Sequence, residues 1–297
     1  MNFGNVLTAM VTPFNQNGDM DLEATRNLVN YLIANGSDGL VVAGTTGESP
    51  TLSHDEKLKL FQFVVEVVGG RVPVIAGTGS NNTRESVELT KEAEGIGVDA
   101  IMLVSPYYNK PSQEGLYQHF KTIAENTSLP IMLYNIPGRS VVNVEPETII
   151  RLSQIDNIVS VKEASGDLDA FAEIISKTAD DFSVYSGDDS LTLPTLAIGG
   201  SGIVSVASHV IGNEMQDMVN SFRSGDVNRA AMLHRHLLPM MKVLFSAPSP
   251  TPLKEALNHI DVPVGGVRLP LVPLNDTERA NLFKVMESYE WKKAVGY

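Results

Sequence analysis

A lysine at the end of an apolar run is the residue best placed for chemistry in this sequence. Lys162 lies in "IVSVKEASGD", residues 158–167. In an extended strand, Ser160 and Lys162 share one face while Val161 and Glu163 share the other, so Glu163 is poorly placed to pair with the lysine. Such a lysine commonly extends to solvent. Buried in apolar surroundings, it can instead act as a neutral amine that forms a Schiff base. Both roles stay open on this run alone.

Other polar side chains also stand where apolar runs end. Tyr134, in "LYNIPGR", carries a hydroxyl that could move protons during carbinolamine formation, dehydration and carbon–carbon bond formation. Thr45 and Tyr108 are further hydroxyls that could link Tyr134 to solvent, although such residues often only cap turns. Arg139 follows a Pro-Gly pair. It is either an ordinary surface arginine or a planar fork for a substrate carboxylate.

The "GTTGES" segment, residues 44–49, places two threonines between glycines. A tight turn is the simple interpretation, but successive N–H groups in such a turn can also bind an anion. Because the segment contains no lysine, a carboxylate fits it better than a phosphate. Gly187 and the region of Val204 also stand at the ends of apolar runs. Together these residues form a coherent candidate site.

Eight apolar runs alternate with amphipathic stretches and would position these residues. The runs are "NVLTAMVTPF", "DGLVVAGTTGES", "VPVIAGTGS", "DAIMLVSPYY", "LPIMLYNIPGR", "NIVSVKEAS", "FSVYSGDD" and "GGSGIVSVAS". Runs that are apolar on both faces are typical of parallel strands covered by helices. The repeated alternation predicts an α/β fold, a (β/α)8 barrel of the TIM type, whose chemistry gathers at the carboxyl ends of the strands. A doubly wound open sheet competes, but no glycine-rich phosphate turn follows the first run.

Helix signals lie between the runs. Ser53 and Glu56 form a capping-box pair with Gly69 as the stop, and a second apolar face over residues 22–33 ends at Gly36. From about residue 208 the strand signals stop, and three stretches (214–226, 227–245 and 275–291) predict helices. We therefore expect a barrel catalytic core over 1–207, then the last barrel helix and a C-terminal helical extension over 208–297.

Composition excludes several classes of protein. The 297 residues are 43% hydrophobic, carry a formal net charge of −13 and include no cysteine. Thiolate chemistry and cysteine-bound metals are therefore excluded, while nucleic acid and anionic membranes are unfavourable partners. His234 and His236 lie two apart in a helical stretch and give no metal signal. The amino-terminal residues do not resemble a signal peptide, and with the absence of cysteine they predict a cytoplasmic protein.

The motifs "GTTGES", "SPYYNKP", "YNIPGR", "VKEASGD", "YSGDD" and "GIVSVAS" resemble the dihydrodipicolinate synthase branch of the pyruvate-dependent class I aldolases. This family is also called 4-hydroxy-tetrahydrodipicolinate synthase, and its superfamily includes the N-acetylneuraminate lyases. The resemblance covers essentially the whole chain. It implies an enzyme of lysine and diaminopimelate biosynthesis that condenses pyruvate with L-aspartate 4-semialdehyde. No cofactor is implied beyond the covalent adduct of the substrate.

The resemblance also implies individual roles. Lys162 would form the Schiff base, and Tyr134 would donate and accept protons through a relay of Thr45 and Tyr108. Tyr108 would reach a neighbouring subunit's site, which implies a dimer or a tetramer. Thr46 and the backbone at Val204 would hold pyruvate, and Gly187 would line the site. Arg139 would bind the carboxylate of the semialdehyde.

In lysine-inhibited members, an interface pocket corresponds here to Ser49, Pro50, His54, Lys57, Asn81, Glu85 and Tyr107. Lys57 replaces a frequent histidine and Pro50 a frequent alanine, which predicts weak or absent inhibition by lysine. Three other functions stay open. One is a lyase for N-acetylneuraminate or a 2-keto-3-deoxy sugar acid, against which Arg139 argues. Another is a non-catalytic barrel, although Lys162 and Tyr134 are both present. The third is a metal-dependent barrel hydrolase, which activity in the presence of EDTA would exclude.

Overall fold

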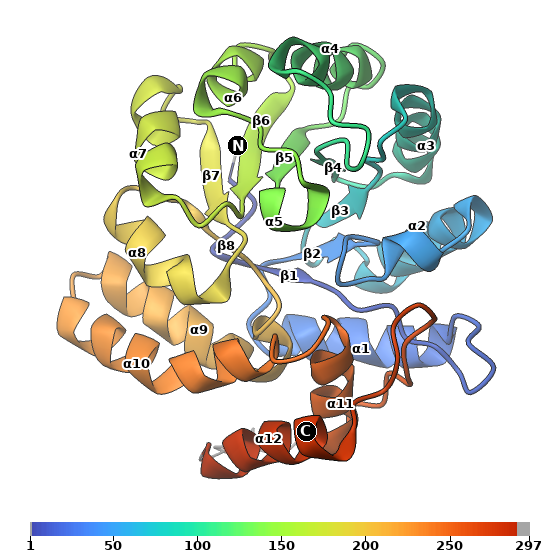
Figure 1. Ribbon diagram of the computed structural model, residues 1–297, viewed down its shortest axis with the longest axis vertical. Coiled ribbons are helices and arrows are strands. Elements are labelled where there is room, and N and C mark those ends of the chain that lie inside the picture. Colours follow the sequence, from blue (N-terminus) through green and yellow to red (C-terminus); the bar gives the residue numbers. More distant parts are fainter. Residues whose placement is uncertain (1, 290–297) are drawn as a thin grey trace.

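Eight parallel strands close into a barrel in the computed structural model, which describes residues 2–289 (Figure 1). Each strand pairs with the next along the chain, and β1 pairs with β8, so the sheet has no free edge. The strands are β1 (Val6–Ala9), β2 (Gly39–Val42), β3 (Val74–Gly77), β4 (Ala100–Val104), β5 (Ile131–Asn135), β6 (Ile158–Glu163), β7 (Ser183–Ser186) and β8 (Gly202–Ser205). The prediction of a (β/α)8 barrel is confirmed.

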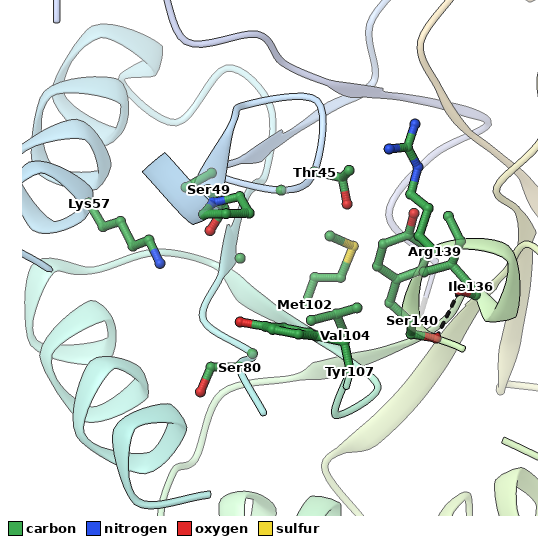
Figure 2. A pocket seen from close by; sticks show the side chains of 16 residues that line it. Thr45, Ser49, Lys57, Ser80, Met102, Val104, Tyr107, Ile136, Arg139 and Ser140 are labelled. Atoms are coloured by element: carbon green, nitrogen blue, oxygen red, sulfur yellow. Dashed lines mark hydrogen bonds between the residues drawn. The ribbon is translucent and has the colours of Figure 1, made fainter. Parts of the chain in front are cut away.

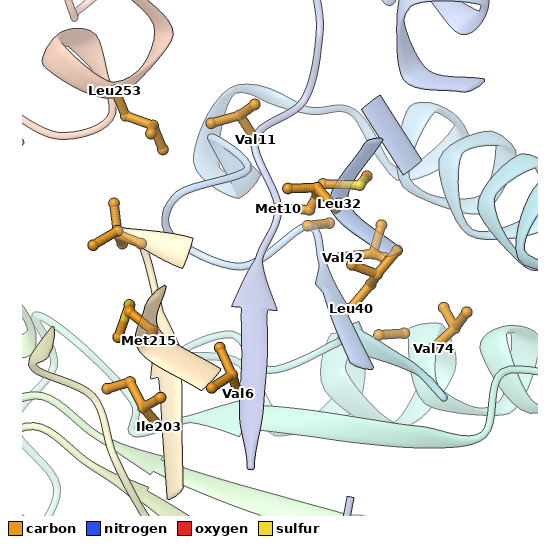
Figure 3. Packing of buried hydrophobic residues seen from close by; sticks show 14 of the residues in the cluster. Val6, Met10, Val11, Leu32, Leu40, Val42, Val74, Ile203, Met215 and Leu253 are labelled. Atoms are coloured by element: carbon orange, nitrogen blue, oxygen red, sulfur yellow. The ribbon is translucent and has the colours of Figure 1, made fainter. Parts of the chain in front are cut away.

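Alternation along the strands divides the buried side chains into two layers. Leu7, Val41, Met102 and Val204 belong to the cluster inside the barrel. Val6, Leu40, Val42, Val74 and Ile203 point outward instead and pack against the surrounding helices, as Figure 3 shows. Because both faces are covered, each strand reads as a nearly continuous apolar run.

The helices of the barrel follow the strands and surround them. They are α1 (Leu22–Ala34), α2 (His54–Val68), α3 (Thr83–Ile96), α4 (Gln113–Ala124), α5 (Pro137–Ser140), α6 (Pro146–Leu152), α7 (Leu168–Lys177), α8 (Thr192–Ala197) and α9 (Ser208–Arg223). Both halves of the predicted capping box form at α2, where Ser53 caps Glu56 and the reverse bond is also present. Gly69 ends that helix with φ of +56°, the left-handed conformation that glycine adopts easily.

Three further helices follow: α10 (Val227–Val243), α11 (Thr251–His259) and α12 (Asp276–Ser288). Helices α10 and α11 pack against α9, and α12, at the bottom of Figure 1, packs against α10 and α11. The helix expected over 214–226 starts earlier, at Ser208, and α11 was not predicted. The end of the helix expected over 275–291, from residue 290, lies outside the described residues. No helix in the described part of the chain combines the length and apolar character needed to cross a membrane.

Candidate active site

Lys162 and Tyr134 face each other across neighbouring strands. They are direct partners in the β5–β6 register, and the Lys162 ammonium nitrogen lies 4.1 Å from the centre of the Tyr134 ring. Both side chains are buried, with 5% and 4% exposure. Within residues 2–289, Lys162 forms no hydrogen bond or ion pair with another side chain. A buried amine without a carboxylate partner is therefore left beside a phenol.

Glu163 lies on the opposite side of the barrel wall, as the alternation along the strand predicts. Its carboxylate accepts hydrogen bonds from the Asn135 amide at 2.9 Å and from the backbone N–H of Ser165 at 2.7 Å. Burial raises the pKa of Glu163, while these hydrogen bonds oppose the rise. It borders a separate cavity of about 180 Å³ outside the barrel. The hydrogen bonds of the Glu163 carboxylate therefore lie on the side of the barrel wall opposite Lys162.

Strands β7 and β8 close the surroundings of Lys162. A Cβ added at Gly187 would come within 3.1 Å of the Lys162 Cε and 2.7 Å of the Ala164 Cβ, so glycine leaves room for the lysine side chain. Val204 is buried in the inner cluster on β8. The structure therefore brings these two predicted residues to the same end of the barrel as Lys162 and Tyr134.

A cavity of about 300 Å³ opens at the carboxyl ends of strands β2 to β5 (Figure 2). Tyr134, Thr45 and Arg139 line it, whereas Lys162 is not part of its wall. The Lys162 amine therefore lies next to Tyr134, a residue of the cavity wall. The other lining residues are Ala43, Gly44, Ser49, Pro50, Lys57, Gly77, Gly79, Ser80, Met102, Val104, Tyr107, Ile136 and Ser140.

The turn that follows β2 presents its two threonines differently. Thr45 lines the cavity, whereas Thr46 is buried at 5% exposure. The N–H of Glu48 donates to the Thr45 carbonyl at 3.1 Å, and the N–H of Ser49 donates to the Gly44 carbonyl at 3.3 Å. The N–H groups of Thr45 and Thr46 donate to no acceptor in the described chain. This leaves two successive donors for an anionic ligand such as a carboxylate.

Arg139 and Tyr108 stand farther from the barrel interior. Arg139 lies on the short helix α5, is exposed and lines the cavity. Tyr108 is 87% exposed and has φ of +74°, which is unusual for a residue with a side chain. Within residues 2–289 no hydrogen bond joins Tyr108, Thr45 and Tyr134. A single chain therefore does not assemble the expected relay.

The residues expected in a regulatory pocket are only partly brought together. Ser49, Pro50, Lys57 and Tyr107 line the same cavity as Arg139, and Lys57 and Arg139 lie on opposite sides of it (Figure 2). His54, Asn81 and Glu85 are not in its wall. His54 pairs with Glu92 at 2.6 Å, and the Asn81 amide donates to the Tyr107 carbonyl at 3.1 Å. Burial lowers the pKa of Lys57, against the opposing charge of Glu85.

Sequence reasoning missed Ser80 and Met102 in the cavity wall. Each of them lies in one of the quoted apolar runs, Ser80 in "VPVIAGTGS" and Met102 in "DAIMLVSPYY". It also missed the residues that hold the end of β8. Asp189 accepts the Ser205 hydroxyl at 2.5 Å and the Ala207 N–H at 2.9 Å, and burial raises its pKa to about 6. Within residues 2–289, no group of three or more His, Asp and Glu side chains is placed to hold a metal ion.

Known proteins resemble this chain over nearly its full length. The model of the dihydrodipicolinate synthetase family matches residues 2–289. The 4-hydroxy-tetrahydrodipicolinate synthase 1 of Halalkalibacterium halodurans is 68% identical over 282 residues, covering 95% of this chain and 96% of that protein. The Bacillus subtilis 4-hydroxy-tetrahydrodipicolinate synthase is 61% identical over 283 residues, covering 95% and 98% of the two chains.

Solved structures agree with this match. Dihydrodipicolinate synthase DapA-2 of Bacillus anthracis superposes with a TM-score of 0.96 at 61% identity, covering 97% of this chain and 99% of that one. The Cyanidioschyzon merolae enzyme with lysine bound gives 0.95 at 46% identity, covering 97% and 98%. The chain therefore belongs to the dihydrodipicolinate synthetase family and is an enzyme with 4-hydroxy-tetrahydrodipicolinate synthase activity in lysine biosynthesis.

Proposed function

We propose that Lys162 forms a Schiff base with pyruvate and that the resulting enamine condenses with L-aspartate 4-semialdehyde. The observation that carries this assignment is the buried Lys162 amine, 4.1 Å from the Tyr134 ring centre and without a carboxylate partner among the described residues. An amine that is not held in an ion pair is available to attack a carbonyl carbon.

The steps follow from that amine. It adds to the ketone of pyruvate, and the carbinolamine loses water to give an iminium. Loss of a methyl proton gives the enamine, whose carbon attacks the aldehyde of the second substrate. The amine of that substrate then closes the ring and displaces Lys162. Tyr134 lines the cavity beside Lys162, where its hydroxyl can carry the protons that these steps release and consume.

Two substrate contacts are supported by position. The unpaired N–H groups of Thr45 and Thr46 would hold the carboxylate of pyruvate, and Gly187 and Val204 would line the pyruvate site. Arg139, exposed at the cavity, would bind the carboxylate of the semialdehyde through its planar fork. A lyase acting on a sugar acid would have no use for this second site, so product analysis with each substrate class separates the two functions.

Intact-mass spectrometry after incubation with pyruvate and borohydride tests the nucleophile. Wild type should gain one reduced pyruvate adduct, and Lys162→Ala should gain none. Lys57→Ala is the matched control, because Lys57 lines the cavity itself and burial lowers its pKa. If the adduct were lost in Lys57→Ala and kept in Lys162→Ala, the assignment of Lys162 would be refuted.

Tyr108 supports a homo-oligomer, either a dimer or a tetramer. Its side chain is 87% exposed on a backbone in an unusual conformation, as expected of a residue that completes a neighbouring subunit's site. Mixing Lys162→Ala with Tyr108→Ala subunits tests this, because mixed oligomers would contain some intact sites. Recovery of activity on mixing is expected, and no recovery in mixed oligomers verified by mass would refute the shared site.

The Lys57 side of the cavity supports weak inhibition by lysine, since a fixed positive charge repels the cationic end of that ligand. Activity should persist at sub-millimolar lysine, and Lys57→His should become more sensitive. Clear inhibition of the wild type at those concentrations would contradict the prediction.

The boundary between 1–207 and 208–297 and a cytoplasmic location stay predictions, testable by limited proteolysis and by cell fractionation.

A further inference from the structure

A buried ion pair joins the turn after β2 to the C-terminal extension. The Glu48 carboxylate lies 2.6 Å from the ammonium of Lys254 on α11, and both side chains are at most 2% exposed. The other Glu48 carboxylate oxygen accepts the backbone N–H of Arg268 at 2.9 Å. The proposed chemistry uses neither Glu48 nor Lys254, although burying a charge pair is costly unless its geometry is good.

Glu48 also closes the turn that presents the two threonines. Its N–H donates to the Thr45 carbonyl at 3.1 Å, and its φ of +56° is a left-handed conformation that is strained for a residue with a side chain. Such a conformation persists only when its surroundings hold it. The carboxylate contacts to Lys254 and Arg268 hold the Glu48 side chain, while the Thr51 N–H and hydroxyl hold the Glu48 carbonyl at 2.9 and 3.0 Å.

The cationic side of the pair is itself fixed in place. The Lys254 ammonium donates to the Gly266 carbonyl at 2.7 Å and lies 4.1 Å from the centre of the Phe14 ring. The Arg268 guanidinium lies 4.3 Å from the same ring centre and pairs with Glu56 at 2.5 Å. Phe14 lies in the loop after β1, Glu56 lies on α2, and Gly266 lies beyond α11. Segments far apart in the chain therefore fix the two cations that contact Glu48.

We propose that Glu48 and Lys254 are positioning residues that hold the N–H groups of Thr45 and Thr46 in the arrangement that binds the carboxylate of pyruvate. This inference rests on the proposed function, because it assigns pyruvate to that turn. It predicts that loss of the pair acts on pyruvate binding and on adduct formation, and much less on the semialdehyde, which Arg139 binds on another element.

The test compares Glu48→Gln, Lys254→Met and the double variant with wild type. Glutamine keeps the acceptor for Arg268 but loses the charge, and methionine keeps the length of the lysine stem. Glu255→Gln is the matched control, since Glu255 is the next residue on α11 and its pair with Arg279, at 2.7 Å, is partly exposed. Thermal melting, the KM of each substrate, kcat and the rate of borohydride-trapped adduct formation are measured for each.

Each single variant should raise the KM for pyruvate at least tenfold and slow adduct formation, with the KM for the semialdehyde within about twofold of wild type. The control should match wild type. Folded variants with an unchanged pyruvate KM and adduct rate, or with both KM values raised equally, would overturn the proposal. If the single variants do not fold, Glu48→Asp and the double variant, which leaves no unpaired charge, are held to the same criteria. Failure of the proposed function itself would appear separately, as a wild type without an adduct on Lys162.

Discussion

When the pH falls from 7 to 5, the free energy of unfolding of His209→Gln should fall by about 2 kcal/mol less than that of wild type. His209 is the second residue of α9 and is fully buried. Its Nε2 accepts the backbone N–H of Val11 at 3.2 Å, and its Nδ1 lies 2.9 Å from the Val206 carbonyl, to which it donates as the neutral ring. Burial lowers the pKa of His209 from 6.5 to about 4.

The sign follows from where the proton binds first. As the pH falls below 6.5, His209 becomes protonated in the unfolded chain, whereas in the folded protein it stays neutral until about pH 4. The free energy of unfolding therefore falls with pH in this window, by about 3 kcal/mol in full and about 2 kcal/mol between pH 7 and pH 5. Asp189 acts in the opposite direction, because burial raises its pKa to about 6, but it is present in both proteins and cancels in the comparison.

Urea unfolding of wild type and His209→Gln at the two pH values measures the effect. The variant should lose about 2 kcal/mol less than wild type on acidification. His119→Gln provides an independent case, since burial lowers the pKa of His119 to about 4 on the separate helix α4. Equal losses in wild type and both variants would refute the argument that these histidines are held neutral.

Four further outcomes are expected. Tyr134→Phe keeps the ring beside Lys162 but loses the hydroxyl, so kcat should fall by about 10²–10⁴, and an unchanged kcat in steady-state assays would remove Tyr134 from proton transfer. Phe120→Ala empties a fully buried site and should cost about 3–5 kcal/mol. Exposed Val272→Ala should change stability by less than about 0.5 kcal/mol in the same urea titration. Activity should also survive dialysis against EDTA, and a loss that divalent cations restore would contradict the cofactor-free mechanism.

The barrel was predictable from sequence because its signals are local. Runs that are apolar on both faces mark strands between a core and covering helices, and the capping box at Ser53 and Glu56 marks the start of α2. The same alternation predicts that Glu163 faces away from Lys162. Helix α11 was missed because its first turn contains Pro252, and proline-rich stretches indicate loops unless the proline is known to occupy the first turn.

The arrangement of the candidate site was predictable only where its residues end strands. Lys162, Tyr134, Val204 and Gly187 meet because a parallel barrel brings the carboxyl ends of its strands together. The pairing of Glu48 with Lys254 has no local signal, since it depends on how α11 docks. A lowered lysine pKa would not have identified the proposed nucleophile either. Desolvation lowers the pKa of Lys254 to about 8, yet that amine is held by Glu48.

Closure of the barrel has a consequence for how the protein is made. Leu7 of β1 pairs with Val204 of β8, so on a ribosome that adds about 5–20 residues per second the first strand waits roughly 10–40 s for its second neighbour. Until then its open edge is a template for pairing with other nascent chains. The ion pair of Glu48 forms later still, because Lys254 is synthesised after β8. The turn that carries Thr45 and Thr46 thus becomes complete only when most of the chain has been synthesised, so truncated translation products should be catalytically silent.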